Sequence, residues 1–200
     1  MGPAYICNSV TVYCSSSDQV DESYTIAARE LGKCLAQNGY TLVFGGGRIG
    51  LMGALSTAAQ NHGGRVVGVI LKEFHDLGVA DPGVSEMEVY KDMRSRKAGL
   101  ERAGDAYVAL PGGLGTFEEI TEILSFKQLG FHNKPIVFVN TNGYFDHLLK
   151  QFEKCFDEKF IEPRFRNLFS VVDSALEAIE IIKNYRPTQQ NLKYNWHLKS

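Results

Sequence analysis

Apolar and polar positions along the chain follow two different rhythms. Short runs rich in β-branched and aromatic residues are followed by longer stretches in which apolar residues recur every three or four positions. Ala27, Leu31 and Leu35, for example, share one face of an expected helix that ends at Gly39. This alternation predicts an α/β fold, a Rossmann-like doubly wound parallel sheet with helices on both faces.

The expected strands are the short runs, Ser9–Cys14, Thr41–Phe44, Arg65–Ile70, Glu86–Tyr90, Ala106–Leu110, Pro135–Val139 and Leu168–Val172. The expected helices are the longer periodic runs, Asp21–Asn38, Gly50–His62, Asp92–Ala103, Thr116–Leu129, Phe145–Glu158 and Ser174–Asn184. Lys72–Gly83 mixes charges with Gly and Pro, which predicts a surface loop near the strand ends. We expect a single nucleotide-binding domain over residues 1–186 and a polar C-terminal tail over 187–200, with Lys193–Ser200 loose.

Composition and charge exclude several classes of protein. A chain of 200 residues with 44% hydrophobic and 22% charged residues is an ordinary globular length and mixture. The net charge of -2 provides no basic field for nucleic acid or an anionic membrane. The apolar runs are shorter than the roughly 18–20 residues that span a membrane, and the first ten residues do not resemble a secretory signal. We therefore expect neither nucleic acid nor membrane as a partner.

Cysteine and histidine spacing gives no indication of a metal site. Cys7, Cys14, Cys34 and Cys155 form no CxxC pair, and the five histidines form no HExxH motif or zinc-like cluster. The cysteines are interpreted as reduced thiols of a cytoplasmic protein. We expect no metal and no cofactor.

The first unusual segment is Gly45–Gly53, which follows the second expected strand and opens a helix. It contains five glycines in nine residues. Glycine lets backbone N–H groups approach an anion closely, and a helix start adds unpaired donors and a positive dipole end. A tight turn that binds nothing would use the same residues. The segment lacks the Gly-Lys-Ser/Thr ending of a P-loop and does not follow the first strand, as a dinucleotide fingerprint would.

The second unusual segment is Pro111–Glu119, again between a strand and a helix. Gly112, Gly113 and Gly115 can present N–H groups, and the Thr116 hydroxyl adds a neutral donor. Two such loops favour a nucleotide over an isolated phosphate. Thr116 and Glu119 also have the spacing of a helix capping box, which requires no catalytic role. Glu118 is an equally charged candidate that spacing cannot dismiss.

A third segment carries positive charge at the start of an expected helix. Arg94, Arg96, Lys97 and Arg102 place four cations within nine residues. A solvated basic face is the ordinary interpretation of such a cluster. Its position just before the strand that leads to Pro111 favours the alternative that one of these cations reaches the ligand edge.

Together these residues resemble the Lonely Guy family of cytokinin-activating phosphoribohydrolases, long mislabelled as lysine decarboxylases. The family motif PGGxGTxxE matches Pro111–Glu119 at every fixed position, and GGGxxGLMG matches Gly45–Gly53 completely. The family's MHxRK motif corresponds to Met93–Lys97, where Arg94 replaces the histidine. The similarity extends from Val10 to Tyr185.

The resemblance implies hydrolysis of a nucleoside 5′-monophosphate, either a cytokinin riboside 5′-monophosphate or AMP, to free base and ribose 5-phosphate by a homodimer or larger assembly. It implies that Arg96 and Glu119 are the catalytic pair, with Arg96 and neither Arg94 nor Arg102 beside Glu119. The substrate-binding residues that it implies are Gly45, Gly46, Gly47, Met52, Arg96, Lys97, Gly112, Gly113, Leu114, Gly115, Thr116 and Glu119.

Two departures from the family pattern bear on substrate recognition. The family's CGSS after the first strand is replaced by Cys14–Ser17, and Lys72–Gly83 lacks an equivalent of the family's substrate-contacting glutamate. Two alternatives therefore stay open. One is a carrier that binds a nucleotide or cofactor in the same phosphate cradle without chemistry. The other is a broad-range AMP nucleosidase of nucleotide salvage.

Overall fold

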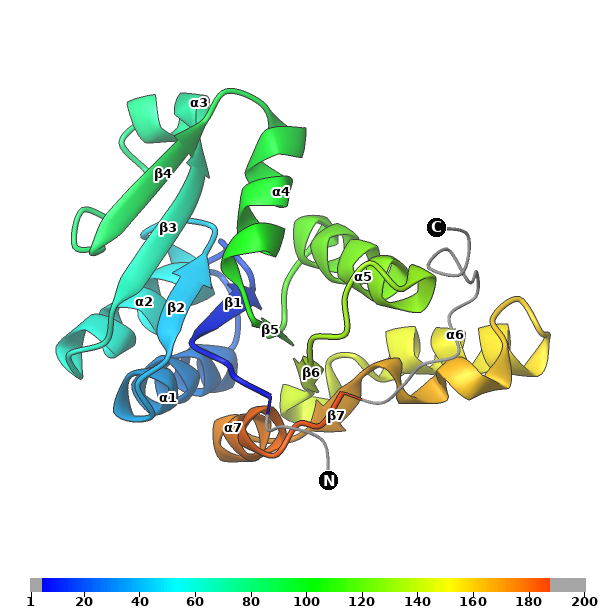
Figure 1. The fold of residues 1–200 in the computed structure, drawn as a ribbon. Coiled ribbons are helices and arrows are strands. Elements are labelled where there is room, and N and C mark those ends of the chain that lie inside the picture. The colour runs from blue at the N-terminus through cyan, green and yellow to red at the C-terminus, as the bar shows by residue number, and fades with distance from the viewer. Residues whose placement is uncertain (1–4, 188–200) are drawn as a thin grey trace.

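Seven parallel strands form one sheet in the computed structural model, which describes residues 5–187 (Figure 1). The strands are β1 (Ser9–Tyr13), β2 (Thr41–Phe44), β3 (Val66–Leu71), β4 (Glu86–Tyr90), β5 (Ala106–Ala109), β6 (Ile136–Val139) and β7 (Ser170–Val172). Their order across the sheet is β4-β3-β2-β1-β5-β6-β7, and each neighbouring pair is parallel.

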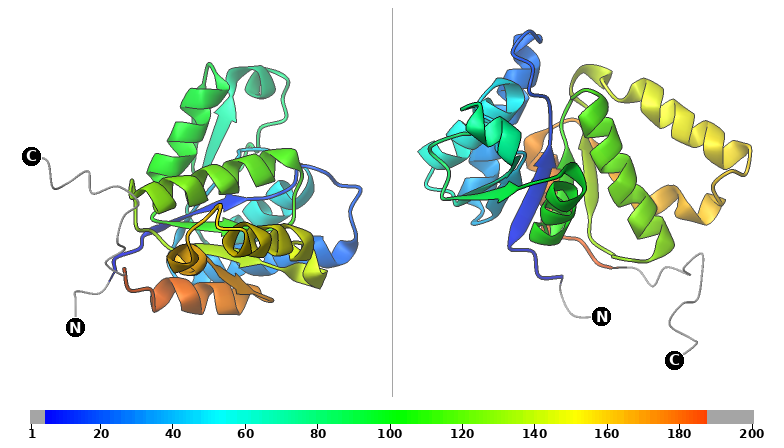
Figure 2. Two further views of the ribbon diagram at one scale, coloured as in Figure 1. Left: turned by 90° about the vertical axis from the view of Figure 1, so that its right-hand side faces the viewer. Right: turned by 90° about the horizontal axis from the view of Figure 1, so that it is seen from above.

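Helices cover both faces of this sheet (Figure 2). One layer consists of α1 (Glu22–Gln37), α2 (Gly50–Asn61) and α7 (Ala175–Lys183), and the other of α4 (Met93–Ala103), α5 (Leu114–Leu129) and α6 (Asp146–Asp157). Side chains alternate along each strand, so Val12 packs under the first layer while Tyr13 packs under the second. The expected doubly wound fold is confirmed.

The elements differ from the expected ones mainly after β3. The sequence predicts a surface loop over residues 72–83, but the short helix α3 (Lys72–Asp76) begins directly where β3 ends. Two 3₁₀ helices, η1 (Thr141–Gly143) and η2 (Pro163–Leu168), flank α6. Because η2 includes Leu168, where the last strand is expected to begin, β7 is shorter than expected. The tail predicted over 187–200 lies, beyond Pro187, outside the described residues.

The winding of the chain reverses between β1 and β5. From β1 the chain proceeds outward through β2, β3 and β4, and α4 then returns it to the centre, where β5 pairs with the other side of β1. At such a point, the loops that follow two neighbouring strands run to opposite faces of the sheet, and a crevice forms between them at the carboxyl ends of the strands. A ligand site is therefore expected among the loops after β1, β2 and β5.

None of the helices within residues 5–187 is long and apolar enough to cross a membrane.

Candidate active site

A cleft of about 710 Å³ opens at the carboxyl ends of β1, β2, β3 and β5. Its walls are formed by Val12, Tyr13, Cys14, Ser15, Ser16, Ser17, Gly45, Gly47, Arg48, Ile49, Met52, Ile70, Phe74, Val79, Arg96, Gly113, Leu114, Gly115, Thr116 and Glu119. Both glycine-rich segments and one member of the basic segment therefore meet in one cavity, large enough for a nucleotide-sized ligand.

The loop after β1 holds the two glycine-rich loops together through its backbone. The Ser15 N–H donates to the Pro111 carbonyl at 3.2 Å, and the Ser15 carbonyl accepts from the Met52 N–H at 3.2 Å. Gly50 has a φ of +64°, and a Cβ there would overlap the backbone of Ser16 and Ser17. Glycine at position 50 is thus required both by its backbone conformation and by the close approach of this loop.

The loop after β5 leads into an α5 whose amino terminus is open to the cleft. The N-cap is Gly113, which offers no side chain to the first-turn N–H groups. Thr116 lies inside the first turn and is buried, so the alternative that Thr116 caps the helix is wrong. A Cβ at Gly112 would overlap the Thr116 hydroxyl, and the Tyr144 hydroxyl donates to the Gly112 carbonyl at 2.6 Å. These contacts fix the loop while its helix N–H groups remain available to an anion.

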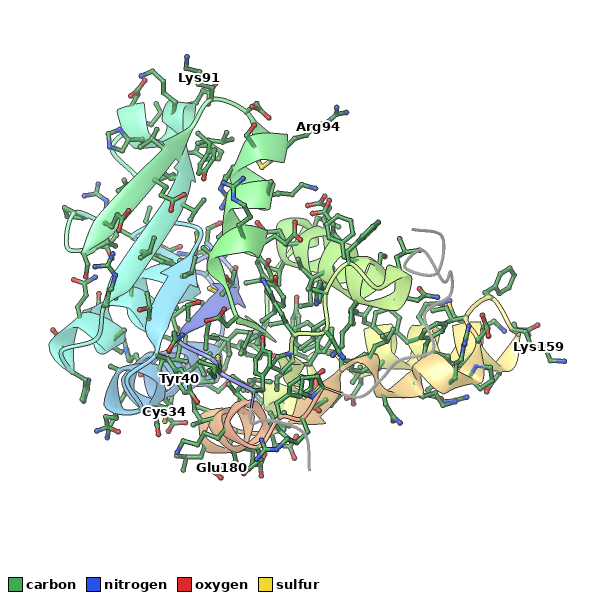
Figure 3. The ribbon with its side chains drawn as sticks, in the orientation of Figure 1. Cys34, Tyr40, Lys91, Arg94, Lys159 and Glu180 are labelled. Atoms are coloured by element: carbon green, nitrogen blue, oxygen red, sulfur yellow. The ribbon has the colours of Figure 1, made fainter. Side chains whose placement is uncertain are left out.

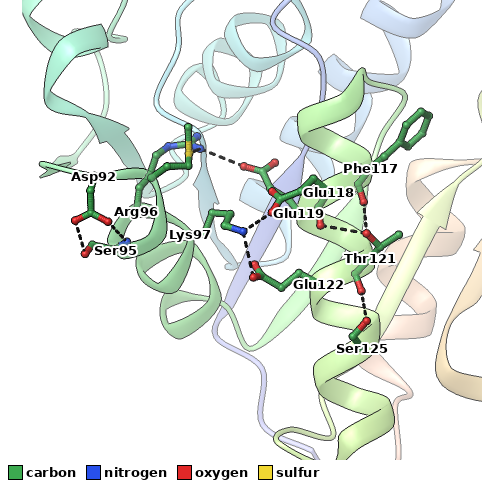
Figure 4. Close-up of polar contacts among 11 residues, drawn as sticks. Asp92, Ser95, Arg96, Lys97, Phe117, Glu118, Glu119, Thr121, Glu122 and Ser125 are labelled. Atoms are coloured by element: carbon green, nitrogen blue, oxygen red, sulfur yellow. Dashed lines mark hydrogen bonds and ion pairs between the residues drawn. The ribbon is translucent and has the colours of Figure 1, made fainter.

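Arg96 and Glu119 form an ion pair in the wall of the cleft (Figure 4). Arg96 Nη1 lies 3.2 Å from Glu119 Oε1, and the two side chains are only 12% and 15% exposed. The guanidinium is also held from behind, because Nε donates to the Val69 carbonyl at 3.0 Å and Nη2 to the Gly45 carbonyl at 3.5 Å. Arg96 therefore bridges the ends of β2 and β3 to α5.

Burial shifts the pKa of the Glu119 carboxyl group. Removal from water raises the pKa of Glu119 above its ordinary value, and the neighbouring Arg96 guanidinium opposes this shift. A carboxylate with a raised pKa in a cleft is suited to proton transfer and to stabilising nearby positive charge.

Local helix geometry explains which cation reaches Glu119. Asp92 caps α4 by accepting from the Ser95 N–H at 2.9 Å, which stabilises the start of the helix at Met93. Arg94 is exposed and points away from the molecule (Figure 3). Arg102 donates to the Tyr90 hydroxyl at 3.1 Å. The prediction that Arg96, and neither of the other arginines, pairs with Glu119 is confirmed.

Lys97 has a different environment from the one expected. Its ammonium contacts Glu118 and lies 3.1 Å from Glu122, both on α5, and it is not among the cleft residues (Figure 4). These hydrogen bonds, with Glu118 contributing most, raise the pKa of Lys97. Lys97 thus joins α4 to α5 and satisfies Glu118, which leaves Glu119 as the carboxylate on the cleft.

Most of the predicted substrate-binding residues lie on the cleft. They are Gly45, Gly47, Met52, Arg96, Gly113, Leu114, Gly115, Thr116 and Glu119. Gly46, Gly112 and Lys97 do not line it. Gly46 has a φ of +78° and its carbonyl accepts from the Asp81 N–H, so it shapes the loop from behind.

Several cleft residues are not identified by sequence reasoning. Arg48 and Ile49 occupy the variable positions of the GGGxxGLMG motif, so the motif itself gives no signal for them. Phe74 and Val79 belong to the segment expected to be a surface loop. An aromatic residue among the charged residues Lys72, Glu73 and Asp76 is the one available signal for Phe74. As for metals, no group of three or more His, Cys, Asp or Glu side chains within residues 5–187 could hold an ion.

Similarity to solved structures extends over most of the fold. The molybdenum cofactor carrier protein of Chlamydomonas reinhardtii aligns with a TM-score of 0.69 at 23% identity, covering 88% of this chain and 95% of that one. The molybdenum cofactor binding protein of Rippkaea orientalis aligns with a TM-score of 0.68 at 23% identity, covering 88% and 94%. At this level of identity the likeness establishes the shared fold alone.

Similarity in sequence is closer. A family model described as possible lysine decarboxylase matches residues 52–182. Cytokinin riboside 5′-monophosphate phosphoribohydrolase LOG1 of Arabidopsis thaliana is 38% identical over 192 residues, covering 95% of this chain and 90% of its own length. The probable enzyme of the same name LOGL6 of Oryza sativa subsp. japonica is 38% identical over 192 residues, covering 95% of this chain and 77% of its own. The chain therefore belongs to the Lonely Guy family of cytokinin riboside 5′-monophosphate phosphoribohydrolases.

Proposed function

We propose that the protein hydrolyses the N-glycosidic bond of a nucleoside 5′-monophosphate and releases the free base and ribose 5-phosphate. The observation that carries this proposal is the buried Arg96–Glu119 pair on the same cleft as the uncapped amino terminus of α5. The names of the curated relatives support the same reaction.

The substrate phosphate is assigned to the amino terminus of α5. The first-turn N–H groups there carry no side-chain cap, and the helix dipole favours an anion at this end. Thr116 adds its hydroxyl from inside the first turn. This binding energy is remote from the reacting carbon and can be used to position the ribose against Glu119.

The reacting bond joins C1′ of the ribose to a ring nitrogen of the base. As it breaks, its electron pair moves to the base and positive charge builds on the sugar, as in glycoside hydrolysis. Ionised Glu119 stabilises that charge and orients a water whose oxygen bonds to C1′. The water supplies hydroxide to the sugar and a proton to the base, so atoms balance without a cofactor or metal. Arg96 keeps Glu119 oriented and ionised.

The base is assigned to the side of the cleft where Ile70, Phe74 and Val79 form an apolar wall. Such a wall accepts the face of a purine and an apolar substituent attached to it. An adenine base fits this proposal, either unmodified as in AMP or with an isoprenoid side chain. The curated relatives are named for a cytokinin riboside 5′-monophosphate.

We also propose a homodimer located in the cytoplasm. Leu114, the first residue of α5, is 86% exposed and Met93, the first residue of α4, is 44% exposed, which supports a protein partner beside the cleft.

The location in the cytoplasm is supported by the cysteines, because all four are free thiols, as in a reducing compartment. The oligomeric state is tested separately. Light scattering should give twice the mass of one chain, and a monomer mass at micromolar concentration would overturn the dimer.

Dependence on the 5′-phosphate tests the proposed function. The purified protein is incubated with AMP, N6-isopentenyl-AMP and the matching nucleosides, and the free base is quantified by chromatography. We expect kcat/KM for each monophosphate to exceed that of its nucleoside by at least about 100-fold, because the nucleoside lacks the group bound at α5. Equal rates for nucleoside and monophosphate would overturn the phosphate assignment. Tight binding of monophosphates without release of base would favour a carrier.

A further inference from the structure

Asp81 is a buried carboxylate for which neither the proposed reaction nor the family motifs provide a role. It lies in the segment after α3 and is 9% exposed. Its Oδ2 accepts from Ser56 Oγ at 2.5 Å and from Gln60 Nε2 at 3.0 Å, and its Oδ1 accepts from the Gly83 N–H at 2.9 Å. All three donors are neutral, and two of them belong to α2. The carboxylate therefore fastens the segment after α3 to the body of α2.

The backbone beside Asp81 pairs with the glycine-rich loop after β2. The Asp81 N–H donates to the Gly46 carbonyl at 2.9 Å, and the Arg48 N–H donates to the Val79 carbonyl at 3.0 Å. Gly47 and Ala80 form an antiparallel bridge between these two bonds. Residues 79–81 thus act as a short extra strand on the loop that forms part of the cleft.

The helix that precedes this strand has little packing of its own. None of the residues of α3 is buried, and Phe74 is 46% exposed. Even so, Phe74 and Val79 both contribute to the wall of the cleft. In Figure 1, α3 lies at the end of β3, beyond the layers of the larger helices. The hydrogen bonds of Asp81 with Ser56 and Gln60 join this wall to a large helix, α2.

From this arrangement we propose that Asp81 is a positioning residue for substrate binding. By joining residues 79–81 to both α2 and the glycine-rich loop, it holds Phe74 and Val79 in place against the base. This inference rests on the proposed nucleotide site. Asp81 itself is not among the cleft residues, so it acts through the wall and not by contact with substrate.

The chemistry of the network defines a specific way to break and restore it. In Asp81→Asn, one carboxylate oxygen becomes an NH₂ group. The new side chain can keep its remaining oxygen for the Gly83 N–H, but its NH₂ then faces the Gln60 NH₂, and two donors cannot pair. Turning the Gln60 amide over would relieve this clash only by giving up the hydrogen bond that Gln60 Nε2 donates to Ser56 Oγ at 2.8 Å. A second change, Gln60→Glu, reverses the polarity, because a glutamate carboxylate accepts from the asparagine NH₂ and from the Ser56 hydroxyl. The double variant keeps the net charge of the wild type.

The experiment compares wild type, Asp81→Asn, Gln60→Glu and the double variant. For each, kcat and KM are measured with AMP and N6-isopentenyl-AMP, the Kd of AMP is measured by calorimetry, and amide hydrogen exchange is followed in peptides covering residues 72–83. Asp81→Asn should raise KM and Kd by about 10-fold while kcat changes less than about twofold, since the catalytic pair is untouched. Amides of residues 79–81 should exchange faster. Gln60→Glu should act similarly by placing two carboxylates together.

Restoration in the double variant is the decisive result. We expect KM, Kd and exchange to return to within about threefold of wild type. Faster exchange without a change in KM or Kd would overturn the proposal, because the segment would then be fastened by Asp81 but irrelevant to binding. A double variant weaker than either single variant would also overturn it. If the wild type releases no base, the proposed reaction fails, while the Kd and exchange data still decide the role of Asp81.

Discussion

Replacing Glu119 with glutamine is expected to reduce kcat by about 1,000-fold or more while the Kd for AMP stays within a few-fold of wild type. Glutamine preserves the volume and one acceptor oxygen for Arg96 but removes the negative charge that stabilises the developing cation. Steady-state kinetics and calorimetry on the same preparation separate the two effects. Glu118→Gln is the matched control, because Glu118 contacts Lys97 and is not among the cleft residues, and it should change kcat less than about threefold.

The pH profile provides a second test of the same residue. Burial raises the pKa of Glu119 above its ordinary value, so its active ionised form is lost as the pH falls through that raised pKa. The acid limb of kcat/KM should therefore lie above the range of an ordinary carboxylate, about 4.3. A wild-type profile flat down to the ordinary range would show that the pKa of Glu119 is not raised. A glutamine variant with near wild-type rate would show that Glu119 has no part in the chemical step.

Arg96→Lys is expected to lower kcat by about 100-fold in a protein that remains folded. The guanidinium divides its donors among the Glu119 carboxylate and the carbonyls of Val69 and Gly45, and a single ammonium cannot reproduce that fork. Kinetics should be accompanied by thermal unfolding, to distinguish a misplaced Glu119 from a loss of fold.

Arg94→Lys serves as the control on the same helix. Arg94 is two residues away and exposed, so the substitution should leave both kcat and KM within about twofold of wild type. Equal losses in the two variants would mean that the positive charge of α4 acts as a whole, and that the contact with Glu119 has no special part.

The hydrophobic rhythm of the chain predicts the fold because parallel strands between helices leave a clear pattern. Buried strands such as β3 and β5 are short and continuously apolar, and the helices between them are amphipathic. One missed element is α3, whose five residues are too few to show a helical period and include no buried position. The pattern places the start of α5 at Thr116, two residues late, because the helix begins without a capping side chain, at Leu114.

The sequence predicts the site residues that belong to glycine-rich or charged motifs. It does not predict the site residues that lie outside such motifs. Arg96 and Glu119 are found through their motifs. Spacing along a helix shows only that Arg94 and Arg96 cannot share a face, and the family motif selects Arg96. Lys97 cannot be separated from Arg96 by sequence, because its partners on α5 become neighbours only in the folded chain. The place of Phe74 in the cleft is not predicted for a related reason. Nothing in the sequence of residues 72–83 shows that this segment folds back along the loop after β2.

The central position of β5 has a consequence for how the protein acquires activity. β1 and β2 are neighbours in sequence, whereas the pairing of Val10 with Ala106 closes a loop that includes the whole first half of the chain. Arg96 precedes β5 and Glu119 follows it, so the strand that joins the second half of the sheet to the first also brings the two charges together. During synthesis, β1 to β4 can assemble with their helices before β5 has emerged. The molecule would then hold four of its seven strands and no catalytic pair, and catalytic competence would appear only once β5 and α5 have joined the sheet.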